Sequence, residues 1–153
     1  MKKIFIYYSL TGNGDLIANY LKDNGYDIRK VETSEQLPRN YFLRILTGGY
    51  KAMINYKDKL INFNSDINNY SEVVIGSPIW NDRLSSPINT VLNELDFVNK
   101  KISFILYSGS GRSTNALEVI KDVYHDADII ELKEPIKNKE ELQKLDYIIK
   151  KVR

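Results

Sequence analysis

The sequence predicts an α/β fold in three layers, a doubly wound five-stranded parallel sheet with helices on both faces. Three apolar runs of strand length, Ile4 to Tyr8, Val73 to Ile75 and Ile102 to Tyr107, lack the strict alternation of a half-exposed strand. A strand that is apolar on both faces is typical of a parallel sheet covered by helices. Weaker runs at Ile28 to Val31 and Ile129 to Leu132 complete the five strands, and right-handed helical crossovers connect them.

The sequence predicts two helices before residue 55, and only the first is followed by a clear stop signal. Residues at helical spacing give the first helix one apolar face, formed by Ile17, Tyr20 and Leu21. Asn24-Gly25 follows it and predicts a left-handed stop. A second helix is expected from Tyr41 to Ile54, interrupted near Gly48-Gly49.

The later helices carry start signals. Ser86-Pro87 predicts a cap followed by proline at the first helical position. A further stripe is formed by Leu117, Ile120 and Val123. Asn138 with Glu141 three residues later predicts a capping box for the last helix. Its inward side chains are expected to be Leu142, Leu145, Ile149 and Val152.

Length and composition exclude several classes of protein. With 153 residues, the chain is expected to form one domain over 1–153. The net charge of +2 is too small to indicate nucleic acid or an anionic membrane as a partner. No run approaches the roughly 18 apolar residues that span a bilayer, and no signal peptide is indicated, so we expect the cytoplasm.

The chain lacks the side chains for several kinds of chemistry. It contains no cysteine, which excludes disulfides, thiol nucleophiles and cysteine metal sites. His125 is the only histidine, so a multi-histidine metal site is excluded, and we expect no metal. A nucleophile elbow needs glycine two residues before and two residues after its serine, but Ser108 and Arg112 stand at those positions around Ser110. This argues against a hydrolase.

Three loops follow the carboxyl ends of the strong strands, where doubly wound sheets bind ligands. They are Ser9 to Gly14, Ser77 to Pro87 and Ser108 to Thr114. The first leads directly from strand into helix, so its backbone N–H groups and the helix terminus can hold a phosphate. The alternative is a plain tight turn capped by Asn13.

Two common phosphate motifs are absent from the first loop. A dinucleotide fingerprint would need glycine where Ile17 stands, and no Gly-Lys pair precedes Ser or Thr as in a Walker loop.

In the second loop, the only tryptophan, Trp80, lies just beyond a buried strand, where it can cover a flat ligand. Alternatively, Trp80 is a rim aromatic that seals the next helix. The third loop is small enough to bring backbone groups against a ring edge.

Together these three loops resemble the flavodoxin family, whose members bind FMN. The resemblance rests on Ser-x-Thr-Gly-Asn after the first strand, Ile-Gly-Ser-Pro-Ile-Trp at the end of the third, and the small loop after the fourth. It implies the strand order 2-1-3-4-5, with phosphate on the first loop, Trp80 against the isoalloxazine and the third loop at the pyrimidine edge. The cofactor-binding residues it implies are Ser9, Leu10, Thr11, Gly12, Asn13, Gly14, Ser77, Pro78, Ile79, Trp80, Asn81, Asp82, Arg83, Ser108, Gly109, Ser110, Gly111 and Arg112.

The sequence departs from that family in three places. Threonine is usual where Gly14 stands, so one hydroxyl contact to phosphate is missing. Around Asn81-Asp82 many flavodoxins have a glycine whose peptide turns over when the flavin is reduced. Many members are acidic, whereas this chain places Arg83 and Arg112 in loops beside the expected ring, where a cation favours the anionic reduced flavin. Alternatively, both arginines are exposed and point into solvent.

The resemblance implies an electron carrier rather than a stand-alone enzyme, with no catalytic side chain. The expected partner is a redox protein or an NAD(P)H-dependent reductase, and the expected state is a monomer or weak dimer. One alternative is a small NAD(P)H-dependent flavin or quinone reductase that uses the same pocket. Another is a fold without cofactor that serves as a binding module, which Gly14 and Asn81 leave open.

Overall fold

The computed structural model describes residues 2–35, 38, 40–54 and 56–151 and contains one mixed sheet. Its parallel strands are β1 (Lys3–Tyr7), β2 (Asp27–Lys30), β3 (Glu72–Trp80), β5 (Lys101–Ser108) and β6 (Asp128–Lys133). They pair in the order β2-β1-β3-β5-β6, which confirms the predicted fold and strand order. A short strand that the sequence did not predict, β4 (Arg83–Leu84), pairs antiparallel with the end of β3.

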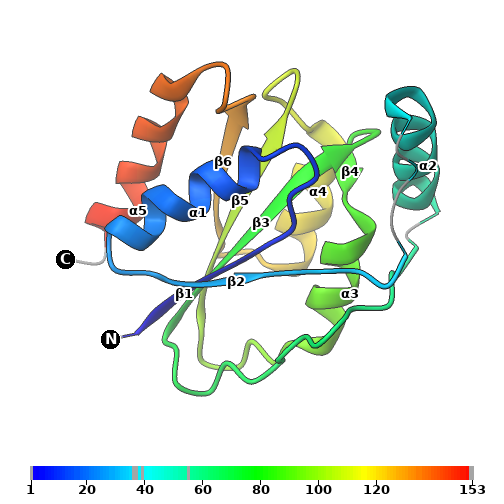
Figure 1. Ribbon diagram of the computed structural model, residues 1–153. Coiled ribbons are helices and arrows are strands. Elements are labelled where there is room, and N and C mark those ends of the chain that lie inside the picture. The colour runs from blue at the N-terminus through cyan, green and yellow to red at the C-terminus, as the bar shows by residue number, and fades with distance from the viewer. Residues whose placement is uncertain (1, 36–37, 39, 55, 152–153) are drawn as a thin grey trace.

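Helices cover both faces of the sheet (Figure 1). Helices α1 (Asn13–Asp23) and α5 (Asp146–Lys150) lie on one face, and α3 (Ser86–Glu94) and α4 (Thr114–Val123) lie on the other. Helix α2 (Tyr41–Met53) packs against β3, β4 and α3, at the end of the sheet where the strands finish.

The core is split by the sheet into two clusters. Alternate residues of β1 point to opposite faces, so Ile4 and Ile6 pack under α3 and α4 while Phe5 and Tyr7 pack under α1 and α5. All four side chains are at most 4% exposed. Burial on both faces explains why these strands lack an alternating pattern.

Helix α1 ends as predicted. Gly25 has φ 84°, and its N–H donates to the carbonyl of Lys22 while the N–H of Tyr26 donates to that of Leu21. These are the two hydrogen bonds of a Schellman motif.

Helix α2, in contrast, is not interrupted at Gly48-Gly49, so that prediction was wrong. Gly48 instead packs against Trp80, as described below.

The start signals of the later helices were only partly correct. The cap of α3 is Ser85, one residue earlier than predicted, and Ser86 opens the helix. The capping box at Asn138 does not form, because the Asn138 side chain donates to the Lys133 carbonyl and the Glu141 carboxylate accepts the Lys133 N–H. A 3₁₀ helix, η1 (Lys139–Leu145), therefore precedes a short α5.

The predicted apolar stripes are mostly buried. Leu145 and Ile149 face the core, Leu142 and Leu117 pack against it, and Ile120 is buried. Val123 is the exception at 64% exposed, because α4 ends there. Val152 lies outside the described residues.

Replacing Gly25 with alanine should lower the free energy of unfolding by about 1 kcal/mol, because a Cβ disfavours the left-handed backbone that closes α1. Chemical denaturation measures this. Gly109→Ala is the matched control, since a Cβ there meets nothing within 4 Å and the backbone is not left-handed. Equal stability of the two variants would contradict this account of the helix end.

Candidate functional site

A cavity of about 670 Å³ lies at the carboxyl ends of the parallel strands. All three predicted loops contribute to it, and so do α2 and the segment after β6. This volume falls within the range of about 300 to 1,000 Å³ typical of small-molecule sites. The cavity is lined by Leu10, Thr11, Asn13, Arg44, Leu46, Gly48, Gly49, Tyr50, Met53, Pro78, Ile79, Trp80, Asn81, Tyr107, Ser108, Gly109 and Glu134.

The first loop gathers backbone N–H groups at the start of α1. Ser9 Oγ accepts the N–H groups of Gly12 at 3.2 Å and Gly14 at 3.1 Å. Among the described residues, no acceptor is found for the N–H groups of Leu10, Thr11 and Asn13. Free amides beside a helix N-terminus, where the helix dipole is positive, form a site for an anion.

Asn13 does not cap α1, so the plain capped turn considered from the sequence does not form. The N-cap is Gly12, with φ 92°. The Asn13 side chain instead accepts the N–H of Ile136 at 3.0 Å and donates to Thr11 Oγ1 at 3.2 Å. Asn13 therefore ties the first loop to the segment after β6 and leaves the start of the helix open.

Gly14 is required by packing. A Cβ at this position would lie 2.7 Å from the Tyr107 hydroxyl oxygen and 2.8 Å from the Tyr7 ring, so threonine does not fit here. The Tyr107 hydroxyl donates to the carbonyl of Tyr8. Burial raises the pKa of Tyr107 well above its ordinary value, so it remains a neutral donor. The missing threonine is thus explained by a tyrosine beneath the loop.

The acidic side chain in the first turn of α1 is neutralised. Asp15 accepts hydrogen bonds from the Tyr7 hydroxyl at 2.7 Å and from Lys30 Nζ at 2.8 Å. Burial raises the pKa of the Asp15 carboxyl, but the bonds from Lys30 and Tyr7 outweigh burial and hold that pKa below its ordinary value. Because Lys30 offsets its charge, Asp15 does not oppose an anion at the first loop.

Trp80 lies at the end of a tight β-hairpin. Trp80 pairs with Arg83, and the two residues between them, Asn81 and Asp82, have φ values of 50° and 57°. Positive φ at both positions defines a type I′ turn. The Asp82 carboxylate accepts the Asn115 N–H at 3.0 Å, and its carbonyl accepts an N–H from the next residue of α4. The hairpin tip is therefore fixed on the N-terminus of α4.

Helix α2 lies directly against the indole. A Cβ on Gly48 would be 3.3 Å from Cδ2 of Trp80, a contact tighter than most Cβ atoms make, so the helix backbone lies close to the ring. The ring of Tyr8 meets Trp80 edge-on, with centroids 5.8 Å apart and planes at 90°. The indole is thus held from two sides while it lines the cavity.

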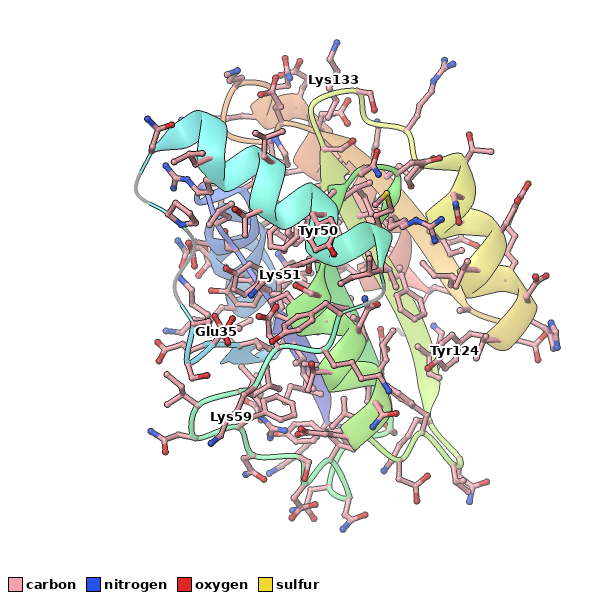
Figure 2. The ribbon with its side chains drawn as sticks, turned by 90° about the vertical axis from the view of Figure 1, so that its right-hand side faces the viewer. Glu35, Tyr50, Lys51, Lys59, Tyr124 and Lys133 are labelled. Carbon is pink, nitrogen blue, oxygen red and sulfur yellow. The ribbon has the colours of Figure 1, made fainter. Side chains whose placement is uncertain are left out.

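A nearly buried ion pair holds α2 in this place. Lys51 Nζ lies 2.7 Å from Asp58 and 3.0 Å from Glu35, and the Lys51 and Asp58 side chains are 13% and 5% exposed. Asp58 also accepts the Ser86 hydroxyl at the start of α3. Figure 2 looks onto α2, with Tyr50 and Lys51 on the helix and Glu35 on the segment beside it. Burial lowers the pKa of Lys51, but the hydrogen bonds to Asp58 and Glu35 outweigh it and raise that pKa.

The structure divides the predicted site residues into three groups. Nine of them line the main cavity: Leu10, Thr11, Asn13, Pro78, Ile79, Trp80, Asn81, Ser108 and Gly109. A smaller adjoining pocket of about 430 Å³ takes in Asp82, Ser110 and Arg112, and it shares Ile79, Ser108 and Gly109 with the main cavity. The others, which line neither, are Ser9, Gly12, Gly14, Ser77, Arg83 and Gly111.

Some of this last group support the site from behind. Ser77 is fully buried, and its Oγ accepts the Ser85 N–H at 3.0 Å, which closes the base of the Trp80 hairpin. Gly111 has φ 70°, and a Cβ there would lie 2.7 Å from Lys133 Cβ, so the third loop packs on the end of β6.

Sequence reasoning missed the contribution of α2. This helix supplies Arg44, Leu46, Gly48, Gly49, Tyr50 and Met53 to the cavity. Leu46, Tyr50 and Met53 are 50% to 60% exposed and follow each other at helical spacing, which is the signal that could have found them. Tyr107 and Glu134 were also missed. Tyr107 was noted only as the end of a predicted strand, and Glu134 follows a strand whose loop carries no motif.

Comparison with solved structures finds flavoproteins and flavodoxins that share this doubly wound fold. The chain is 22% identical to a protein named as a flavoprotein from Bacteroides eggerthii DSM 20697, with TM-score 0.72 over 96% of this chain and 97% of that one. It is 18% identical to a flavoprotein in complex with FMN from Lactobacillus acidophilus NCFM, with TM-score 0.66 over 91% and 97%. A flavodoxin from the domain Archaea matches at 14% identity and TM-score 0.54 over 97% and 94%.

These likenesses show that the chain has a flavodoxin-like fold. Comparison with protein-family models finds no match, and comparison with curated proteins finds none either. Within the described ranges, no helix is both long and apolar enough to cross a bilayer. Nor do three or more acidic or histidine side chains there come together as a possible metal site.

Gly48→Val should displace α2 from Trp80 and change the intrinsic fluorescence of the protein, because valine inserts atoms where the helix touches the ring. Trp80 is the only tryptophan, so tryptophan emission reports the surroundings of this one ring. Gly49→Val is the control, since a Cβ at Gly49 is 3.8 Å from its nearest neighbour. Identical spectra for both variants would contradict the contact.

Lys51→Gln should lower the free energy of unfolding by about 3 kcal/mol, because it leaves the buried Asp58 carboxylate without its cation. The raised pKa of Lys51 means that its stabilisation is complete below the unfolded pKa of about 10.4 and is lost as pH rises through the folded pKa. Denaturation at pH 7 to 11 should show a constant difference that shrinks above about pH 10.5.

Lys150→Gln is the control for this ion pair. Lys150 and Asp146 form an exposed pair on α5, and exposed pairs contribute little to stability. If the Lys51 variant is no less stable than the Lys150 variant, the ion pair does not hold α2 in place.

Proposed function

We propose that this protein binds FMN in the main cavity and transfers electrons between a reduced donor and a redox partner. The observation that carries the proposal is the cavity itself. It joins a loop of free amides at a helix N-terminus to a fixed indole, at the edge of the sheet where ligands of doubly wound folds bind.

The residues present fit this cofactor. The N–H groups of Leu10, Thr11 and Asn13 are placed to donate hydrogen bonds to the phosphate, next to the positive end of α1. Trp80 offers a flat apolar surface for the isoalloxazine. Ser108 and Gly109 bring polar backbone close to the expected pyrimidine edge. The Lactobacillus acidophilus flavoprotein, which has the same fold, was solved with FMN and supports this choice.

In this proposal the cofactor supplies the redox chemistry, and the protein binds and orients it. Ser9 and Gly14 shape the phosphate loop from behind. Asp82 keeps the indole in position through α4. The apolar residues of α2 exclude water from one side of the ring. No side chain is required as a general acid or base.

A partner and a compartment belong to the same proposal. The partner is a redox protein or an NAD(P)H-dependent reductase, and the protein acts as a monomer or weak dimer. The cytoplasm is the proposed compartment, since a chain without cysteine needs no oxidising environment.

A second candidate is a small NAD(P)H-dependent flavin or quinone reductase. The adjoining pocket favours it, because Ser108 and Gly109 line both cavities and a second ligand could lie beside the ring. NADPH alone should bleach bound FMN rapidly in a reductase. In a carrier, bleaching is slow until a partner reductase is added.

Titration of the purified protein with FMN tests the proposal, read by absorption between 350 and 500 nm and by quenching of flavin fluorescence. Saturable binding is expected. Trp80→Ala should weaken it by about 1 to 3 kcal/mol, through lost stacking and apolar burial.

Tyr147→Ala is the control for this variant, because Tyr147 is an exposed aromatic on α5 and lies outside the cavity. It should bind FMN as the wild type does. No binding by the wild-type protein would refute the proposed function, whereas unchanged affinity of Trp80→Ala would remove only the indole from the site.

A further inference from the structure

Arg44 is the one cationic side chain among the described residues that line the main cavity. It lies on α2, one helical turn before Gly48, which touches Trp80. The sequence pointed to two other arginines, Arg83 and Arg112, beside the expected ring. Arg83 lines neither cavity, and Arg112 lines the adjoining pocket.

One donor of the Arg44 side chain, its Nε, is buried without a hydrogen-bond acceptor among the described residues. None of the ion pairs formed by those residues includes it, since Lys51 takes both nearby carboxylates, Asp58 and Glu35. A buried donor without an acceptor is destabilising, more so when it is charged, so an acceptor in the cavity would relieve a real penalty.

The charge of Arg44 acts on the Trp80 side of the site. Burial raises the pKa of Tyr8 and Asp58 adds to this effect, while the positive charges of Lys51 and Arg44 oppose it. Tyr8 in turn meets Trp80 edge-on. The phosphate loop packs on the opposite face of β1, where Gly14 rests on Tyr7.

On this basis we infer that Arg44 stabilises the reduced form of the flavin ring in preference to the oxidised form. The inference rests on the proposed function. Two electrons and one proton that enter the oxidised ring from a reductant leave it with one negative charge. A guanidinium beside the ring favours that anion, and an arginine N–H can donate to it.

The test compares the dissociation constants of oxidised and reduced FMN for the wild type, Arg44→Gln and Arg83→Gln. Dithionite is the reductant, and dyes of known potential report the midpoint. Arg44→Gln should weaken binding of reduced FMN about tenfold more than binding of oxidised FMN. For a two-electron couple this lowers the midpoint potential by about 30 mV. Arg83→Gln is the matched control and should leave the potential unchanged.

Arg44→Met is a second neutral variant, suited to the apolar wall of α2, and it should give the same shift if the glutamine variant does not fold. Thermal denaturation of the apoprotein identifies the folded variants. If neutral variants weaken both redox states equally, or if Arg83→Gln lowers the potential as much, the inference is wrong.

Riboflavin, which lacks the phosphate, provides the remaining arm. If Arg44→Gln weakens FMN binding but leaves riboflavin binding intact in both redox states, Arg44 contacts the phosphate and the inference is overturned. A loss confined to the reduced state with either flavin supports it. Failure of the wild type to bind either flavin would instead refute the proposed function.

Discussion

The contact between Gly48 and Trp80 is the constraint on which the candidate site depends. The backbone of α2 comes close to the indole at Gly48, where a Cβ would make an unusually tight contact with the ring. Two further restraints act on the same hairpin, since Ser77 closes its base and Asp82 fixes its tip on α4. The aromatic wall of the cavity is therefore formed before any ligand arrives, which reduces the ordering that binding would require.

Side chains at the end of β1 alternate between the two faces of the sheet, and this places the anion-binding loop and the aromatic wall of the cavity on opposite faces. Tyr7 and Tyr8 are neighbours in the chain, but successive side chains of a strand point to opposite faces. Tyr7 lies beneath α1, where it supports Asp15 and the loop of amides. Tyr8 points to the other face and meets Trp80. One strand end thus joins an anion-binding half to an aromatic half.

Much of this arrangement could be predicted from local sequence. Buried strands, the glycine end of α1 and the edge of the sheet that carries the site all follow from short patterns and from the rule for doubly wound folds. The failures have a common physical cause. The glycines at Gly48-Gly49 predicted a break in α2, because the local sequence does not show that Gly48 packs against Trp80, which is distant in the chain. Asn138 was interpreted as a cap, but a carbonyl of β6 competes for its side chain.

Net charge is a poor guide to the field inside this cavity. The chain carries a formal +2, yet the charged groups near the site are mostly paired locally: Asp15 with Lys30, Glu134 with Lys137, and Asp58 with Lys51. Each pair presents little net charge to a ligand a few ångströms away. Among the described cavity residues, Arg44 is the cation without such a partner. A charge that lines the cavity acts on a ligand at shorter range and with less screening than surface charges do, so Arg44 contributes strongly to the electrostatic character of the site.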